Sequence, residues 1–249
     1  MLGYILLFTF LASIVSLFLV AILLLHKTLI RKTSFLLVSF AAGALLATGF
    51  METLKEAVEI AGADVFLWTT VSIAGFFLIE RLFISLHHHD EEDPSINSGK
   101  LKIPTSFLVF GDALHNFIDG MSIAAGFLVN FQLGFVTSIA VFIHEIPHEL
   151  GDFGILIHKG WGRAGVLWLN AATGLVSILG AIVVFYLGKQ FSDIVPVLLS
   201  VAAANFIYLS ATDLLPEIHH RANKNFAVRY TLSFFMGIFL IIFLIKILN

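Results

Sequence analysis

Apolar residues dominate this chain in long runs, and short polar stretches separate one run from the next. Because the hydrocarbon core of a bilayer is about 30 Å thick, a helix needs roughly 20 mostly apolar residues to cross it. The runs predict eight transmembrane helices, at residues 2–25, 35–54, 65–86, 104–129, 132–158, 163–189, 195–214 and 227–248. We therefore predict an all-α integral membrane protein, with residues 1–249 forming a single polytopic membrane domain.

The composition supports this assignment, since 59% of the residues are hydrophobic, 12% are charged and the mean hydropathy is +0.98. Soluble domains are about one quarter charged. A formal net charge of −3 speaks against a nucleic-acid partner, and the lack of cysteine excludes disulfides and thiolate metal ligands. The first run, residues 2–25, follows no basic segment and exceeds the apolar core of a signal peptide, so we expect a transmembrane helix there.

Lysine and arginine predict the orientation of the helices. Of the 14 such residues, 11 lie in or beside the loops that follow the first, third, fifth and seventh predicted helices. Because cytoplasmic loops are enriched in these residues, we expect those loops in the cytoplasm and both termini on the extracytoplasmic side.

The longest predicted loop, at about residues 87–103, begins with three histidines and four acidic residues, His87–Asp93. Two interpretations stay open for it. Histidine-rich tracts collect metal ions, but a charged, flexible composition also simply keeps a loop in water.

Polar residues that are costly in lipid gather in the fourth and fifth predicted helices. An acidic residue at the centre of a membrane helix costs about 3 kcal/mol on insertion scales, so a cluster of them needs a compensating partner. A turn of 100° per residue places these side chains on one face of each helix. They are Asp112, His115, Asn116 and Asp119 in the fourth helix, and His144, Glu145, His148, Glu149 and Asp152 in the fifth. The short connector near residues 130–133 makes the two helices antiparallel neighbours, so we expect the two polar faces to meet.

Imidazole, carboxylate and amide groups without thiolate suit a borderline divalent cation, with Zn²⁺ first and Fe²⁺, Mn²⁺ and Cd²⁺ as further candidates. Two i, i+4 pairs on facing helices can supply four ligands to one ion. The pairs are His115 with Asp119, and His144 with His148. Asn116 and Glu145, each one residue further along, would project to a flank and serve a second ion or a gate.

The sixth and seventh predicted helices carry quieter polar positions. Asn170 precedes a stretch of small residues that suits close helix packing in lipid. We interpret Asn205 as a residue that hydrogen-bonds between helices rather than as a metal ligand.

The fourth and fifth helices resemble the ZIP family of divalent metal transporters, in the branch whose fifth helix carries HExPHE. The matching residues are His115, Asn116, Asp119 and Gly120 for HNxxDG, and His144, Glu145, Pro147, His148 and Glu149 for HExPHE. The resemblance implies two three-helix bundles related by an inverted repeat, with helices four and five between them. It also implies transport of zinc or similar ions into the cytoplasm.

A binuclear metal centre is a further implication of this resemblance. By motif position, the first site would be His115, Asp119, His144 and His148, and the second would draw on Asn116, Glu145 and Asn170. Family members often have a bridging carboxylate where this chain has His148, and a neutral imidazole bridges poorly. Glu149 is therefore the residue that we expect to take the bridging role.

Two other functions fit the sequence. His144–His148 satisfies HExxH, the zinc motif of metalloproteases, with Glu145 as general base. The second function is a metal-sensing receptor that binds zinc through His87–His89. We favour transport over proteolysis because Pro147 is awkward in a catalytic helix, and because helix four offers more ligands than the three a zincin needs.

The prediction is thus a zinc transporter of the plasma membrane and not an enzyme. Its expected partners are a divalent metal ion as transported substrate, the lipid bilayer and a second copy in a homodimer. No organic cofactor is expected.

Overall fold

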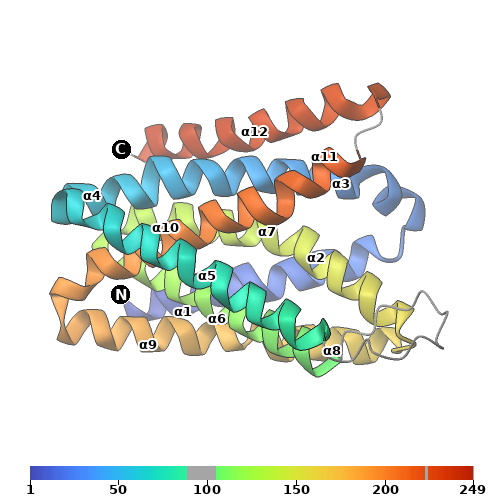
Figure 1. Cartoon of the computed structure of the whole chain (residues 1–249), viewed down its shortest axis with the longest axis horizontal. Coiled ribbons are helices and arrows are strands. Elements are labelled where there is room, and N and C mark those ends of the chain that lie inside the picture. Colours follow the sequence, from blue (N-terminus) through green and yellow to red (C-terminus); the bar gives the residue numbers. More distant parts are fainter. Residues whose placement is uncertain (89–104, 222–223, 249) are drawn as a thin grey trace.

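The computed structural model describes residues 1–88, 105–221 and 224–248, and helices make up nearly all of them, with no strand among these residues. The helices run lengthwise in a bundle, and the two chain ends lie at the same end of it (Figure 1). The all-α prediction is confirmed.

The long helices follow the predicted segments, and several contain a π-helical or 3-10 turn. In chain order the elements are α1 (Leu2–Phe10), a π-helical turn (Leu11–Val15), α2 (Ser16–Leu23), α3 (Lys27–Ala47), a π-helical turn (Thr48–Leu54), α4 (Lys55–Ala61), a 3-10 turn (Gly62–Asp64), α5 (Val65–His88), α6 (Thr105–Val129), α7 (Phe131–His158), α8 (Arg163–Gly174), α9 (Val176–Gln190), a 3-10 turn (Ser192–Ile194), α10 (Val195–Leu209), a π-helical turn (Ser210–Leu214), α11 (Leu215–Arg221) and α12 (Lys224–Leu248).

Five stretches of the described residues are long and apolar enough to cross a membrane: Leu2–Leu23, Thr33–Leu82, Arg163–Gln190, Ser192–His219 and Ala227–Leu248. The protein is therefore an integral membrane protein. The second stretch contains most of α3 and most of α5, while α6 and α7, which carry the polar motifs, fall outside the five. The count of eight crossings therefore stays a prediction.

Helices α6 and α7 lie in the middle of the bundle. Helix α6 packs most extensively against α9 and α7 and also contacts α10, whereas α7 packs against α2 on one side and α3 on the other. Asn130 is the N-cap residue of α7. Its side chain accepts a hydrogen bond from the Leu133 N–H at 2.7 Å. This cap explains why the chain reverses between α6 and α7 within so few residues.

Glycine allows α6 and α9 to touch backbone to backbone. A Cβ atom at Gly120 would overlap the carbonyl group of Ser177, and one at Gly180 would overlap that of Phe117. Gly43 plays the same part between α3 and α12. Small residues permit such close approach in membranes, and the small-residue packing predicted for the sixth helix is confirmed at Gly180.

The polar half of α6 lies next to a buried apolar core. Beyond Asp119 the helix continues with Ile123 and Phe127, which are buried together with Leu133 of α7 and Phe206 of α10. This apolar core lies on the side of the polar residues nearer the chain ends, since α6 ends and α7 begins there (Figure 1).

Candidate metal centre

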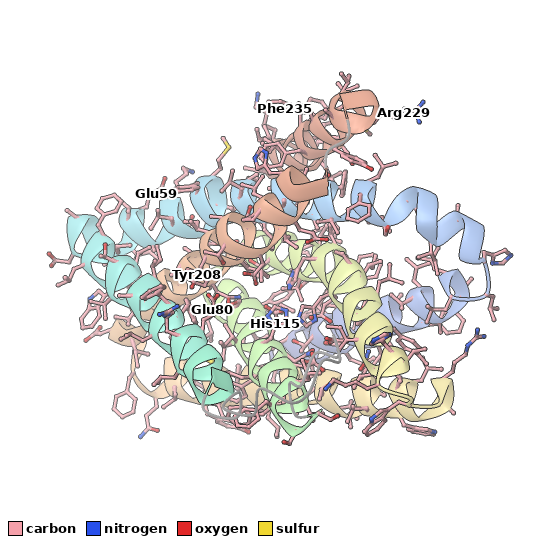
Figure 2. All side chains as sticks on the ribbon, turned by 45° about the vertical axis from the view of Figure 1, so that its right-hand side comes forward. Glu59, Glu80, His115, Tyr208, Arg229 and Phe235 are labelled. Atoms are coloured by element: carbon pink, nitrogen blue, oxygen red, sulfur yellow. The ribbon has the colours of Figure 1, made fainter. Side chains whose placement is uncertain are left out.

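Four ligand atoms converge between α6 and α7. His144 Nε2 lies 2.9 Å from Asp119 Oδ2 and 3.2 Å from His115 Nε2. His115 Nε2 also lies 3.5 Å from Asp119 Oδ2 and 3.5 Å from Glu145 Oε1. We call these four residues the buried group, and their ligand atoms all lie within 4.8 Å of one another. Figure 2 shows His115 in the interior of the bundle, between α6 and α7.

The hydrogen bonding of His144 leaves its Nε2 without a hydrogen to donate to Asp119. His144 Nδ1 lies 3.0 Å from the Ala140 carbonyl oxygen, which can only accept, so Nδ1 carries the hydrogen and Nε2 presents a lone pair. This lone pair faces Asp119 Oδ2, another acceptor, and both side chains are only 1% exposed. Two buried acceptors in contact repel one another unless a cation lies between them.

A second set of ligands lies one helical turn further from the chain ends. His148 Nδ1 is 3.6 Å from Asp152 Oδ2 and 3.9 Å from Asp112 Oδ1. We call these three residues the outer group. The side chain of His148 is 30% exposed, that of Asp152 is 20% exposed and that of Asp112 is 11% exposed. The outer group is therefore closer to water than the buried group.

The two groups adjoin through their imidazole rings. The rings of His115 and His148 stack with their centroids 4.4 Å apart. Helical pairing assigns four residues to one ion, and the structure brings three of them together, His115, Asp119 and His144. Glu145 lies beside these three, and the fourth residue, His148, lies in the outer group. Which residues bind which ion stays a prediction.

The other candidate ligands lie around these groups. Asn116 donates through Nδ2 to Asp112 Oδ1 at 2.9 Å, and its own Oδ1 has no hydrogen-bond partner among the described residues. Asn170 is 4% exposed, and its Nδ2 is likewise unpartnered within the described part of the chain. Glu149 belongs to neither group, since its Oε1 accepts a hydrogen bond from Ser16 of α2 at 3.1 Å.

Two residues outside the motifs support the candidate ligands. Asn205 of α10 donates to Asp119 Oδ1 at 3.4 Å, so the predicted interhelical role of Asn205 is confirmed. The sequence did not point to Ser16, because an isolated serine in an apolar helix usually bonds its own backbone. Ser16 does so as well, since the Ser13 carbonyl oxygen lies 2.8 Å from its Oγ, so its single hydroxyl hydrogen is shared between Ser13 and Glu149.

The predicted metal-collecting loop, His87–Asp93, has no structural description, because residues 89–104 and the side chains of His87 and His88 lie outside the described part of the protein. Its two interpretations stay open.

Comparison with known proteins decides the family. The model of the ZIP zinc transporter family matches residues 88–245, which is more than half of the chain. The chain belongs to the ZIP zinc transporter family. The family resemblance drawn from the motifs in α6 and α7 is thereby confirmed.

Individual relatives of this ZIP chain are themselves named zinc transporters. It is 47% identical over 111 residues to zinc transporter foi of Drosophila melanogaster, which is 45% of this chain and 16% of that protein. It is 38% identical over 126 residues to human zinc transporter ZIP4, and this match covers 51% of this chain and 19% of ZIP4. It is 30% identical over 198 residues to zinc transporter ZIP13 of Pongo abelii, and this match covers 73% of this chain and 58% of that protein. The chain thus spans less than two thirds of these relatives.

The protease alternative receives no support from these comparisons.

Proposed function

We propose that this chain is a transmembrane transporter that carries divalent transition metal ions, with zinc as its principal substrate, into the cytoplasm. One observation carries the proposal: His115 Nε2, Asp119 Oδ2 and His144 Nε2 converge in the interior of a ZIP-family membrane protein, and the buried Asp119 Oδ2 has no hydrogen-bond partner among the described residues. The zinc-transporter names of the relatives support the same substrate.

The ligands of the first ion are His115, Asp119, His144 and His148, as the motif implies, and Glu145 lies beside three of them in the buried group. Neutral imidazoles and two carboxylates offset the charge of one dication inside lipid. Fe²⁺, Mn²⁺ and Cd²⁺ accept the same ligand set. We further propose that Asn116, Glu145 and Asn170 contribute to a second ion, as the family motif implies, with Glu149 in the bridging role.

The burial of the site supports a direction of access. Ile123 and Phe127 are buried on the side towards the chain ends, whereas the outer group is partly exposed on the other side. The lysine and arginine pattern places that other side in the cytoplasm. An ion in the buried group would therefore leave towards the cytoplasm in the conformation described here.

Several parts of the proposal rest on the sequence alone. They are a single polytopic domain over residues 1–249, extracytoplasmic termini, a location in the plasma membrane, the homodimer and the absence of an organic cofactor.

Uptake by proteoliposomes tests the function directly. The purified chain should carry Zn²⁺ across the vesicle membrane, and a panel of Zn²⁺, Fe²⁺, Mn²⁺ and Cd²⁺ would establish its selectivity. His144→Ala should abolish uptake, while His26→Ala, which removes an exposed imidazole far from the site in sequence, should leave it unchanged. Undiminished uptake by His144→Ala would reject the site, and cleavage of a membrane peptide without ion flux would favour the protease.

A further inference from the structure

The two oxygens of the Asp119 carboxylate face different partners. Oδ2 lies 2.9 Å from His144 Nε2 and 3.5 Å from His115 Nε2, so it belongs to the converging ligand atoms of the buried group. Oδ1 accepts a hydrogen bond from Asn205 Nδ2 at 3.4 Å. The Asp119 side chain is 1% exposed, so both oxygens are shielded from bulk water. One oxygen is therefore directed at the metal site, and the other is held by α10.

Asn205 comes from a helix that supplies none of the motif ligands. It lies in α10, which packs along α6, and the preceding residues Ala202–Ala204 are buried. Small residues of this kind let two helices approach closely in a membrane. Asn205 itself is 7% exposed. Because a carboxylate oxygen only accepts hydrogen bonds, the amide must turn its NH₂ group towards Asp119. The Asn205 side chain is thereby fixed as a donor to one carboxylate oxygen.

The number of oxygens that a carboxylate gives to an ion affects which ion it suits. Zinc favours a tetrahedral set of ligands, and the buried group offers such a set with a single oxygen from Asp119. Mn²⁺ prefers an octahedral set of oxygen ligands. Ions that take many oxygen ligands commonly bind both oxygens of one carboxylate, as calcium does. A donor that occupies Asp119 Oδ1 therefore favours zinc, because it limits Asp119 to one bond with the ion.

We propose that Asn205 is a positioning residue that sets the preference for zinc over Mn²⁺, because it holds Oδ1 and leaves Asp119 to bind the transported ion through Oδ2 alone. Without this donor, Oδ1 is a buried oxygen without a hydrogen bond, which is costly, and turning Oδ1 onto a bound ion removes that cost. The gain is larger for an ion that accepts more oxygen ligands. This inference rests on the proposed function, since the ion that Asn205 selects is the transported one.

Metal binding to the purified full chain tests this role without requiring transport. Equilibrium dialysis with radioactive zinc and radioactive manganese gives the ratio of the two dissociation constants. Asn205→Leu keeps the approximate size of the side chain and removes the donor. It should weaken zinc binding by about tenfold, since loss of an outer-shell partner of a metal ligand costs 10–100-fold in affinity. Mn²⁺ binding should be retained, because the freed oxygen adds a ligand, so the preference for zinc should also fall by about tenfold.

Three further variants separate this role from an effect on packing. Asn205→Gln keeps an amide donor and should keep the preference for zinc. Asn205→Ala lacks the donor and should lose the preference, so the test does not depend on one folded variant. Ser200→Ala removes a buried hydroxyl from the same helix, but this hydroxyl donates to the Pro196 carbonyl oxygen at 2.7 Å, so both metals should bind as in wild type. Equal losses for zinc and Mn²⁺, or an unchanged ratio, in Asn205→Leu and Asn205→Ala would overturn the proposal.

Uptake by proteoliposomes separates this inference from the proposed function. Zinc uptake by wild type, with the same ratio of kcat/KM for zinc and Mn²⁺ in Asn205→Leu as in wild type, would refute the role of Asn205 and leave transport standing. The predicted loss of zinc preference in dialysis, together with no flux of any ion in wild type, would support the role of Asn205 at the site and refute transport.

Discussion

Replacing Asp119 by asparagine separates the role of this side chain as a metal ligand from its effect on the stability of the metal-free protein. Asn keeps the shape of Asp119 and removes its charge. In the metal-free protein Asp119 Oδ2 faces the lone pair of His144 Nε2 at 2.9 Å, so an amide N–H at that position could donate to His144. We therefore expect Asp119→Asn to be at least as stable as wild type without metal, and to bind zinc poorly.

The loss in zinc affinity follows from the charge that is removed. Unit charges 4 Å apart attract by about 4 kcal/mol at an effective dielectric constant of 20, so a dication and a carboxylate attract by about 8 kcal/mol. The hydration that both partners give up offsets much of this attraction. We expect a net loss of about 2.7 kcal/mol, which is roughly 100-fold in affinity.

Thermal unfolding and uptake together measure both effects. Zinc at 100 times its dissociation constant should stabilise wild type by about 2.7 kcal/mol. Asp119→Asn should melt no lower than wild type in EDTA, gain only about 0.4 kcal/mol from the same zinc concentration and take up zinc with a KM raised about 100-fold. An Asp119→Asn variant that melts lower in EDTA but transports zinc with an unchanged KM would refute the reasoning, because Asp119 would then be only structural.

Three further predictions concern packing, a supporting contact and pH. Gly120→Ala should destabilise the protein by about 1–3 kcal/mol, since its Cβ meets the backbone of α9, whereas Gly111→Ala on the same helix meets open space and should be neutral in chemical unfolding. Ser16→Ala should cost about 1 kcal/mol, because Glu149 Oε1 loses the hydroxyl that it shares with the Ser13 carbonyl oxygen, with Ser72→Ala, a half-buried serine that bonds its own backbone, as control. Zinc uptake should fall as the pH is lowered from about 7.5 to about 5.5, because protonated imidazole cannot bind metal; a flat profile would argue against histidine ligands.

The fold was largely predictable because lipid imposes a simple constraint on the chain. Runs of roughly 20 apolar residues must be helices, and a connector as short as the one at Asn130 must join neighbours. The π-helical turns were not predictable. The turn at Thr48–Leu54 buries Glu52 to 8% exposure, whereas its place near the end of a predicted helix favours an interfacial carboxylate in water.

The face of each helix was predictable, but its contacts were not. The period of 3.6 residues places Asp112, His115 and Asp119 on one side of α6, and they do lie towards α7. Nothing in that period identifies Ser16 as the donor to Glu149, since this contact depends on how α2 packs against α7. Sequence reasoning therefore found the candidate ligands more readily than their supporting contacts.

The position of His148 shows where helical geometry stops being informative. In an antiparallel pair, Asp119 lies at the depth of His144 and His115 at the depth of His148, as their contacts of 2.9 Å and 4.4 Å show. Depth alone allows all four residues to surround one ion. The direction of the His148 ring is a matter of side-chain torsion, and in this structure its Nδ1 lies within 4 Å of the carboxylates of Asp112 and Asp152. The same backbone is therefore compatible with one ion held by the four motif residues or with His148 turned away from that ion, and the torsion of the His148 side chain decides between them.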